Sequence, residues 1–267
     1  IIGINNNLNK LAYKYYKNKL AGTYKDGWYK LHDEPDNYNS LMNNVKLDEK
    51  SVVHSLHLGD TAPVYVGENI FKNDTDIEQK FTTASFTEKT SETIITTTTK
   101  GFSFGGDTSF VLPIIEKGMR IAGTVNSSST ESIYNLVEKT LVASPQQVTV
   151  PAKKTYIAKV FLEQRNFEGL VKYSAIGNQP KIHIDTRGTF FEGIGGPTAR
   201  KYSFDLTASQ AWSELTKEEK SELNLTFSGE DMVVEGEAEV EGVFGSRLTV
   251  VITEKETGKL VKTIHFS

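Results

Sequence analysis

The stretch GFSFGGDTSFVLPIIEKGMRIAGTVNSSS, residues 101–129, decides the fold class of this chain. Apolar and polar residues alternate along both of its halves, a period of two that is typical of strands with one buried and one solvated face. A loop at residues 114–117 keeps both faces uniform, because it places Leu112 opposite Met119. The stretch therefore predicts an amphipathic hairpin whose arms, about a dozen residues each, approach the length of a tilted strand that crosses a bilayer.

The flanks of this predicted hairpin are rich in hydroxyl side chains. Residues 82–100, TTASFTEKTSETIITTTTK, contain neither Pro nor Gly, and threonine favours strands, so they predict a long solvated strand. The hairpin pairs Asp107 with Thr124 on its polar face and has an apolar tip at residues 113–115. A half-buried hairpin of a β-sandwich has the same alternation, but the hydroxyl-rich flanks and the apolar tip favour a hairpin that leaves the body for a membrane.

The composition excludes several classes of protein. The chain has 267 residues, a formal net charge of −4, no cysteine and a mean hydropathy of −0.37. No apolar run approaches the roughly 18 residues of a membrane-spanning helix, and the mild acidity argues against nucleic acid as the main partner. The lack of cysteine excludes disulfides, thiolate metal sites and a thiol nucleophile.

Periodicity predicts a mostly β chain with two short helices. Residues 5–20 have helical spacing, and residues 213–223 predict a second helix that is capped by Ser213. From residue 52 onward the period is nearly all two, and several strands exceed the usual five or six residues, which predicts an elongated body. The longest strand candidates are residues 93–112, 120–142, 147–164 and 231–240, followed by shorter ones at 169–175 and 248–253.

Aromatic side chains are concentrated near the N-terminus, where Tyr24, Trp28, Tyr29 and Tyr38 follow the first predicted helix. Two interpretations remain open for this region. It is either a small satellite core or a recognition surface, because Tyr and Trp combine rigid contact area with a polar group.

Three segments of the chain resemble a single family of toxins. They are VYVGENIFKNDTDIEQKFTTASFTEKTSETIITTTTKG at residues 64–101, SPQQVTVPAKKTY at residues 144–156 and VEGEAEVEGVFGSRLTVVI at residues 234–252. In combination and in this order, they are similar to segments of the epsilon-toxin and mosquitocidal-toxin family of aerolysin-like β-pore-forming toxins. The resemblance covers nearly the whole chain and is closest at residues 64–156.

The resemblance implies an elongated, mostly β, aerolysin-like fold with long twisted antiparallel strands and a small N-terminal helical region. It implies a secreted soluble monomer that binds a cell-surface receptor, protein or glycan, and assembles into a ring, often of seven copies, on the target-cell bilayer. Each subunit then contributes one hairpin to a transmembrane β-barrel. No enzymatic activity, cofactor or nucleic acid partner is implied. The resemblance also implies three regions. The expected receptor-binding region consists of residues 1–60 and about 170–223. The expected central β region, residues 61–100 and 127–169, carries the hairpin 101–126, and the expected C-terminal β-sandwich consists of residues 224–267 with parts of 61–100 and 145–160.

The resemblance also assigns roles to the alternating residues. The expected lipid-facing residues are Phe102, Phe104, Phe110, Leu112, Met119, Ile121 and Val125. The expected tip consists of Pro113, Ile114, Ile115, Glu116 and Lys117. The expected pore-lining residues are Asp107, Ser109, Arg120, Thr124 and Asn126. The expected receptor-binding residues are Tyr24, Trp28, Tyr29, Tyr38 and Tyr202.

The chain departs from the family pattern in two places. Trp28 and Tyr29 look like the family's N-terminal aromatic pair, but Gly193 and Gly196 stand where its later aromatic partners are expected, so we expect a different receptor. The candidates that replace those partners are Phe190, Phe191 and Tyr202. The chain also stops at Ser267, about where the family's inhibitory C-terminal peptide begins, so we expect an activated form or a member without that peptide.

Two other functional classes serve as alternatives. An enzyme is disfavoured, because His54 and His57 lie in a strand or coil segment that does not suit a helical metal site, and His183 with Asp185 predicts a surface pair on one strand. The acidic residues that alternate over residues 235–241 predict a solvated strand face. The second alternative is a non-toxic, lectin-like module on the same scaffold, in which the aromatic region binds a glycan and the hairpin stays in place.

Overall fold

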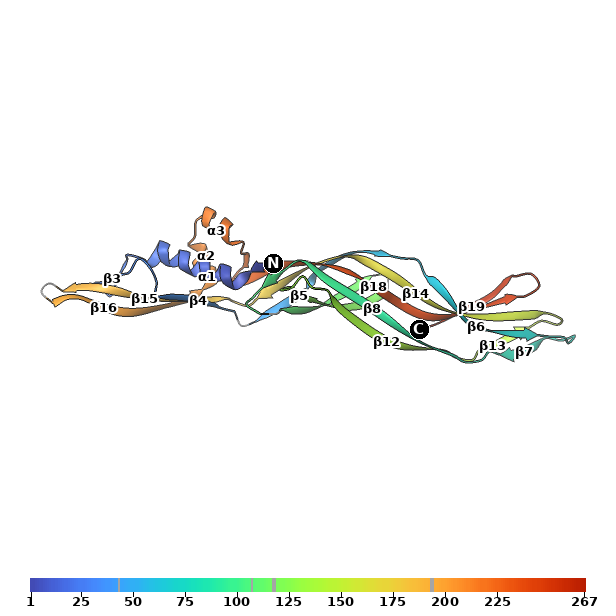
Figure 1. Cartoon of the computed structure of the whole chain (residues 1–267). Helices are drawn as coiled ribbons and strands as arrows, with labels where there is room; N and C mark the ends of the chain where they lie inside the picture. Colours follow the sequence, from blue (N-terminus) through green and yellow to red (C-terminus); the bar gives the residue numbers. More distant parts are fainter. Residues whose placement is uncertain (43, 107, 117–118, 193–194) are drawn as a thin grey trace.

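The molecule is long and narrow, with its α-helices near one end and long twisted strands that run to the other (Figure 1). This computed structural model describes residues 1–42, 44–106, 108–116, 119–192 and 195–267, without the side chains of Met119 and Glu192. The arrangement confirms the prediction of an elongated, mostly β chain with a small helical region. No helix among the described residues is both long enough and apolar enough to cross a membrane.

The helical end, which we call the head, consists of residues 1–41 and 181–223. Helix α1 (Ile4–Tyr15) continues as the π-helix η1 (Tyr16–Leu20) and buries Leu8 and Leu11 against a small sheet. The strands of this sheet follow the order β16-β15-β3-β2, and β4 pairs with β15. Their bounds are β2 Tyr24–Lys25, β3 Tyr29–Leu31, β4 Asn37–Leu41, β15 Lys181–Glu192 and β16 Gly196–Thr207.

Two short helices stand where one was predicted, α2 (Ala208–Ser213) and α3 (Lys217–Leu223). The prediction that Ser213 caps a helix is wrong, because Ser213 ends α2. Thr207 and Thr216 are the caps, and each forms a capping box with the residue three positions later. A capping box satisfies two backbone N–H groups at once, so it determines where each short helix begins.

The body of the molecule is an eight-stranded sheet in which β12, β8, β18, β14 and β5 follow one another. β17 and β19 also pair with β18, and β6 pairs with β14. Most neighbours are antiparallel, as predicted from the resemblance. The bounds are β5 Val45–Leu58, β6 Ala62–Lys72, β8 Phe86–Lys100, β12 Ile133–Ala143, β14 Thr155–Gly177, β17 Phe227–Ser228, β18 Asp231–Glu254 and β19 Leu260–Phe266.

β14 and β18 pair with each other over almost their whole length, and we call this ladder the spine. The strands have 23 and 24 residues, so the shorter strands that were predicted within them are merged. Gly169 begins one of the predicted strands and Gly242 lies between two of them, but in the structure both lie inside long strands. A Cβ at Gly242 would meet the Phe167 ring at 2.9 Å, and one at Gly169 would meet the Leu56 backbone at 2.9 Å. These glycines therefore allow close approach between neighbours, which is a known use of glycine within strands.

Two hydrophobic cores lie along the body. The larger one joins the head to the near half of the sheet, and the smaller one, which contains Val148, Val160 and Leu248, fills the far end. A two-stranded sheet of β7 (Gln79–Thr82) and β13 (Gln147–Val150) also lies at the far end (Figure 1).

The predicted regions map onto this architecture as follows. β5 and residues Leu170–Gly177 of β14, which were both expected in the receptor-binding region, lie in the eight-stranded sheet rather than in the head. The spine belongs to both the central and the far part, because each of its strands passes through both. How the chain divides into functional regions stays a prediction.

Candidate functional site

The amphipathic hairpin is present but has a different register from the predicted one. It consists of β10 (Ser109–Glu116) and β11 (Met119–Asn126), which pair from Ser109 opposite Asn126 to Glu116 opposite Met119. The prediction of a loop at residues 114–117 is therefore wrong, because Ile114, Ile115 and Glu116 lie within β10. Residues 117–118, which connect the two strands in the sequence, lie outside the described part of the chain, and the predicted tip residue Lys117 is one of them.

The two faces of the hairpin nevertheless keep their predicted composition. The observed register differs from the predicted one by four residues, and an even shift leaves every side chain on its own face. Pro113, whose position suggested the end of a strand, is tolerated in β10 because, among the described residues, this strand pairs with β11 alone and Pro needs no donor on its other side. The predicted partner of Thr124, Asp107, lies outside the described residues, and Val111 is the observed partner.

The apolar face of the hairpin is turned into the protein. Phe110, Leu112, Ile114 and Val125 are buried, and Ile121 is half-buried. Ile114, predicted to be at the tip, is in fact part of this face. Nothing is described for the side chain of Met119, which pairs with Glu116. Three of the residues expected to meet lipid, Phe110, Leu112 and Val125, are thus buried on this face of the hairpin.

Two of the expected lipid-facing residues, Phe102 and Phe104, do not belong to the hairpin strands. Phe102 lies in the short strand β9 (Phe102–Ser103), which pairs in parallel with β1 (Ile2–Gly3), and the next described strand begins at Ser109. The prediction of one strand over residues 93–112 is therefore wrong. The Phe102 ring is fully buried and lies 6.0 Å from the Phe110 ring, so both still share one core.

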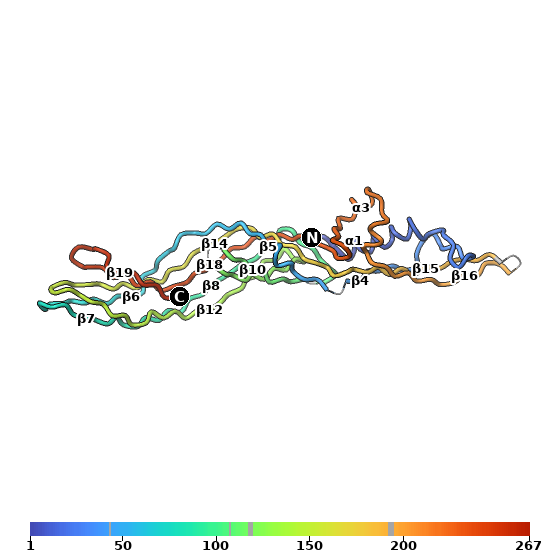
Figure 2. The backbone as a smooth tube through the Cα atoms, turned by 180° about the vertical axis from the view of Figure 1, so that it is seen from behind, coloured from blue at the N-terminus to red at the C-terminus, as the bar shows by residue number. Residues whose placement is uncertain are grey.

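The hairpin lies on the surface formed by β5, β8, β14 and β18, which we call the seat. β10 contacts β5 and β11 contacts β8, and Figure 2 shows β10 beside β5 as well. No backbone ladder joins the hairpin to the eight-stranded sheet among the described residues. Its contacts are instead made by side chains. The Phe110 ring lies 5.9 Å from the Tyr173 ring of β14, and Gly123 fits over Ile94 and Thr96 of β8.

Three side chains of the seat bind carbonyl groups of the hairpin. Thr96 Oγ1 donates to the Thr124 carbonyl and Thr98 Oγ1 donates to the Asn126 carbonyl at 2.7 Å, while His54 Nε2 lies 2.9 Å from the Ile115 carbonyl. The hydroxyl-rich strand that the sequence predicted is therefore β8, and its inward hydroxyls replace a backbone ladder. Because a hydroxyl is also readily hydrated, departure of the hairpin would leave these side chains satisfied by water.

Ser127 closes the base of the hairpin. Its backbone N–H donates to the Thr108 carbonyl at 2.9 Å, its carbonyl accepts from the Phe102 N–H at 2.9 Å, and its hydroxyl donates to the Phe102 carbonyl at 3.0 Å. The side chain is fully buried. This residue therefore defines the point where the hairpin joins the body.

Three buried polar atoms of the described residues have no hydrogen-bond partner, and all three belong to the boundary between hairpin and seat. They are Tyr173 Oη, His54 Nδ1 and Glu116 Oε2. His54 Nδ1 and Glu116 Oε2 lie 3.4 Å apart. Burial raises the pKa of Tyr173 to about 12. The His54 and Glu116 atoms are within ion-pair distance of each other, whereas the Tyr173 hydroxyl has no polar partner. An unsatisfied buried polar group costs about 1–3 kcal/mol, so the Tyr173 hydroxyl makes this boundary less stable than its apolar area suggests.

The sequence reasoning missed His54, Glu116 and Tyr173 as parts of this site. A signal existed only for Glu116, which has the same parity as Leu112 and Ile114 and so belongs on the apolar face. His54 was considered only as a metal ligand, and Tyr173 is one of eleven tyrosines. Nothing local identifies either of them as a neighbour of the hairpin.

The opposite face of the hairpin is in contact with water. Ser109 and Arg120 are exposed, and Thr124 and Asn126 are half-buried. These are four of the five residues expected to line a pore, and the fifth, Asp107, lies outside the described residues. The alternation that the sequence predicted thus separates a dry face from a wet one.

An aromatic cluster lies on the head. The Phe190 ring is 6.0 Å from the Trp28 ring and 5.6 Å from the Tyr29 ring, and the Tyr202 ring is 6.2 Å from that of Tyr29. Arg200 stacks over Tyr29 with its guanidinium carbon 4.5 Å from the ring centre. Phe190 and Tyr202, two of the three candidates for the missing aromatic partners, therefore lie beside the Trp28–Tyr29 pair.

The aromatic cluster borders a cavity of about 550 Å³, which is also lined by Tyr24 and Phe191. Trp28 and Phe191 are 68% and 77% exposed, which is unusual for such large apolar side chains. Tyr38 lies apart from this cavity and contacts Tyr13 at 5.5 Å between ring centres. The structure thus brings four of the five expected receptor-binding residues together but not Tyr38.

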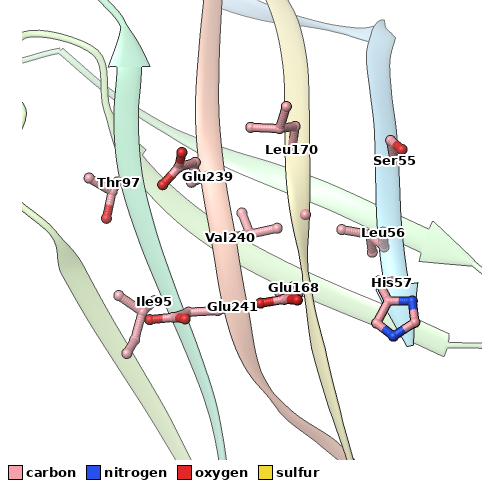
Figure 3. A pocket seen from close by; sticks show the side chains of 11 residues that line it. Ser55, Leu56, His57, Ile95, Thr97, Glu168, Leu170, Glu239, Val240 and Glu241 are labelled. Atoms are coloured by element: carbon pink, nitrogen blue, oxygen red, sulfur yellow. The ribbon is translucent and has the colours of Figure 1, made fainter. Parts of the chain in front are cut away.

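Another cavity, of about 620 Å³, lies on the sheet face that points away from the hairpin (Figure 3). Glu168 on β14 is the direct cross-strand partner of Glu241 on β18 and of His57 on β5. Glu239 is exposed on the same face, as predicted for the alternating acidic residues 235–241. Carboxylates that face each other repel, and no group of side chains among the described residues is arranged to hold a metal ion.

His183 forms the surface pair that was predicted, together with a third group. Its Nδ1 lies 2.7 Å from Asp205 Oδ1 and its Nε2 lies 2.8 Å from Asp185 Oδ1, and Ser203 Oγ donates to the same Asp185 oxygen. These carboxylates, Asp205 most strongly, raise the pKa of His183. The group lies on the head sheet, away from the hairpin.

The fold and the hairpin with one dry face define an aerolysin-like β-pore-forming scaffold. The Mpp75Aa1.1 β-pore-forming protein from Brevibacillus laterosporus has a similar structure, with a TM-score of 0.62 at 18% identity over 97% of this chain and 92% of that one. Residues 35–265 match the family described as Clostridium epsilon toxin ETX/Bacillus mosquitocidal toxin MTX2, and the chain belongs to this family. No curated protein matches the sequence.

Two further solved structures share the fold. The Cry23Aa1 and Cry37Aa1 binary complex gives a TM-score of 0.52 at 16% identity, over 100% of this chain and 97% of that one. A non-toxic crystal protein from Bacillus thuringiensis gives 0.52 at 14% identity, over 95% and 98%. At these identities the likeness establishes the fold and leaves the target open.

Proposed function

We propose that this chain is a secreted pore-forming toxin that binds a cell-surface receptor, assembles into a ring and inserts one β10–β11 hairpin per copy into the target membrane. The observation that carries the proposal is a hairpin with a dry apolar face and no described backbone ladder to the sheet beneath it. Such a hairpin can leave as a unit, because only side-chain contacts and a few hydrogen bonds need to break.

The hydrophobic effect determines where a released hairpin can go. Four apolar side chains of the hairpin are buried on the seat, those of Phe110, Leu112, Ile114 and Val125. Burying each of them stabilises the seated hairpin by about 1.5–3 kcal/mol relative to exposing it to water. Release into water would lose this stabilisation, whereas release into lipid keeps it. The unsatisfied Tyr173 hydroxyl at the boundary lowers the free energy needed to leave the seat.

Insertion requires assembly, because two strands alone would leave unpaired backbone groups in the hydrocarbon. A closed barrel is the β arrangement that satisfies all of these groups, so hairpins from several copies must insert together. β10 and β11 have eight residues each, and a tilted strand needs about 9–11 to cross a bilayer, so flanking residues extend the strands.

In this mechanism the two faces of the hairpin keep their roles. The residues that meet lipid are Phe110, Leu112, Ile114, Met119, Ile121 and Val125, together with Phe102 and Phe104 once the strands extend. The residues that line the pore are Asp107, Ser109, Arg120, Thr124 and Asn126. We propose as the receptor-binding site the head cluster of Trp28, Tyr29, Phe190 and Tyr202, together with the cavity beside it that Tyr24 and Phe191 line.

A disulfide between hairpin and seat tests the insertion step. A Cβ at Gly123 would lie 3.2 Å from Thr96 Cγ2, so Gly123→Cys with Thr96→Cys is expected to bridge β11 and β8. The oxidised variant should bind cells and assemble but release no dye from them, and a reductant should restore leakage. The chain has no other cysteine, so the bridge is unambiguous.

The matched control bridges the spine. Val171 and Ala238 are buried cross-strand partners on β14 and β18, and Val171→Cys with Ala238→Cys should leave leakage unchanged whether oxidised or reduced. Full leakage from the oxidised Gly123–Thr96 variant would contradict insertion of this hairpin.

The receptor site is tested on the head. Trp28→Ala with Phe191→Ala removes two highly exposed rings at the cavity and should weaken cell binding about tenfold or more, while leakage from receptor-free liposomes at high dose stays the same. Tyr38→Ala is the matched control, because this ring lies outside the cavity. Equal cell binding by the double variant and the control would show that this aromatic site does not bind the receptor.

The second candidate is a binding module that never releases its hairpin. The aromatic cavity of the head favours it, since exposed rings beside polar groups suit the faces of sugar rings, and one structural neighbour is described as non-toxic. Agglutination without dye release, and without SDS-resistant oligomers, would support this candidate.

A further inference from the structure

A cavity of about 430 Å³ lies where strand β11 of the hairpin meets the body. It opens beside an irregularity of the spine, where Gly245 has a φ of +66° and two residues of β18 stand opposite Gln164. A bulge of this kind bends the strand and turns side chains to new directions. The lining residues that carry charge are Glu92, Arg120, Lys139, Arg165 and Arg247.

The cavity holds more positive than negative charge. Lys139 Nζ lies 3.0 Å from Glu92 Oε1, and Arg247 Nε lies 2.7 Å from Glu163 Oε2, so these two cations are paired. Arg120 and Arg165 form no ion pair with any described residue. Two guanidinium groups thus line one cavity, and neither is paired with a carboxylate of the described residues.

The Arg165 side chain is held in place through one nitrogen of its guanidinium group, and the other two nitrogens remain available. Its Nε donates to the Gly59 carbonyl at 2.9 Å, and its guanidinium carbon lies 6.0 Å from the Phe244 ring centre. The two terminal nitrogens have no hydrogen-bond partner among the described residues. A guanidinium group fixed in this way presents donors in the fork geometry that matches phosphate oxygens.

The polar groups around the bulge are already satisfied by one another. The Ser246 N–H donates to Glu92 Oε1 at 2.9 Å, and Gln164 Nε2 donates to Ser246 Oγ at 2.8 Å. They therefore do not compete for the free guanidinium donors, which are left for a ligand.

We propose that this cavity binds a phosphate group between Arg120 of the hairpin and Arg165 of the spine. Because the two arginines belong to parts that separate on insertion, a bound phosphate group favours the seated hairpin and resists its release. Binding itself is independent of the proposed function, and only its effect on leakage rests on that function.

The direct test is calorimetric titration of inorganic phosphate into the full chain at constant ionic strength. We expect saturable binding that weakens at least about tenfold in Arg165→Gln and in Arg120→Gln. Arg187→Gln is the matched control, since this guanidinium group pairs with Asp36 on the head and lies away from the cavity. Arg165→Lys, which keeps the charge but loses the fork, should bind with intermediate affinity, and it guards against a folding defect in the glutamine variant.

Two arms distinguish the sources of the phosphate group. Phosphatidylcholine vesicles with a minor fraction of phosphatidic acid should recruit the chain through Arg165 if the group is a lipid headgroup, and inorganic phosphate should compete. Vesicles with phosphatidylserine at the same charge density control for non-specific attraction. Binding of inorganic phosphate alone, with no recruitment to either vesicle, identifies a soluble ligand.

Hydrogen exchange separates this proposal from the pore. Saturating phosphate should slow exchange in β10 and β11 of the wild type but not of Arg165→Gln. Slower exchange with no change in leakage would support phosphate binding at this site and contradict the pore mechanism. Unsaturable binding, or equal affinity in wild type and Arg165→Gln, would overturn the site.

Discussion

The hairpin and the spine contribute to the same core but are held by different kinds of bond. β14 and β18 pair by backbone from Tyr156 opposite Glu254 to Gly177 opposite Met232. Among the described residues, the backbone ladder of the hairpin lies within the hairpin itself, which rests on its seat through apolar side chains and three side-chain contacts to its carbonyls. The spine is thus held in register by backbone pairing along its length, whereas no described ladder holds the hairpin to its seat.

Glycines in the two regions illustrate the same difference. At Gly242 in the spine, a Cβ would strike the Phe167 ring and the backbone of Thr93 on the next strand, so the close approach is between strands of one sheet. At Gly123 in the hairpin, the nearest atoms are the ends of the Ile94 and Thr96 side chains. Side-chain ends move easily, whereas a neighbouring backbone does not, so contact in the hairpin is the more readily broken.

The largest expected effect comes from two leucines that are both 0% exposed, Leu112 on the hairpin and Leu248 on β18. Each Leu→Ala substitution should cost about 2–5 kcal/mol through lost burial and a cavity. For Leu248→Ala the cost should appear as a lower Tm of the whole molecule. For Leu112→Ala it should appear as faster hydrogen exchange in β10 and β11, with little change in the main thermal transition.

The same pair also tests whether the hairpin is a separate unit. If Leu112→Ala and Leu248→Ala lowered the main transition equally and left local exchange unchanged, the hairpin would be part of one cooperative fold. The comparison between the two regions would then fail.

A smaller effect is expected from two buried tyrosines. Tyr173 under the hairpin has an unpartnered hydroxyl, whereas Tyr16 in the head bonds the His32 carbonyl and the Thr186 hydroxyl. Tyr173→Phe should therefore stabilise the seated hairpin by about 1–3 kcal/mol and slow leakage, while Tyr16→Phe should destabilise the head by about 1 kcal/mol. Hydrogen exchange of β10 and of α1, together with dye-release rates, measures both.

Alkaline pH sharpens this second test. Because burial raises the pKa of Tyr173 from 10.0 to about 12, the seated state loses stability as the pH rises from 10 towards 12 and the released phenol ionises. Tyr173→Phe should abolish that part of the pH dependence. Equal exchange rates of β10 in wild type and variant over this range would refute a role for the hydroxyl.

The smallest effect is expected in the head, at His183. Hydrogen bonds to Asp205 and Asp185 raise the pKa of His183 above 6.5, so the protonated form stabilises the head below pH 6.5, and this stabilisation is lost as the pH rises through the raised pKa. An exposed pair is worth about 0–1 kcal/mol, so the change is modest. His183→Gln should reduce the difference in Tm between about pH 6 and about pH 9, and hairpin exchange should not respond.

Part of the fold and of the site could be predicted from local pattern. Alternation identified β8, the hairpin and the acidic face of β18, and helical spacing identified α1, because these periods follow from backbone geometry at each residue. The boundaries of the strands in the spine could not be predicted in this way. The predicted strands were interrupted before Gly169 and around Gly242, and only the neighbours that approach these glycines explain why the observed strands continue.

The sequence by itself determined which side chains of residues 109–126 share a face, since a period of two survives any even shift in register. Only the tertiary structure decided the register itself, the burial of Ile114 and Glu116, and the meeting of His54 and Tyr173 with the hairpin. It also decided that Phe190 and Tyr202 join Trp28 and Tyr29. The physical reason is that faces follow from bonds along the chain, whereas partners depend on which distant surface covers them.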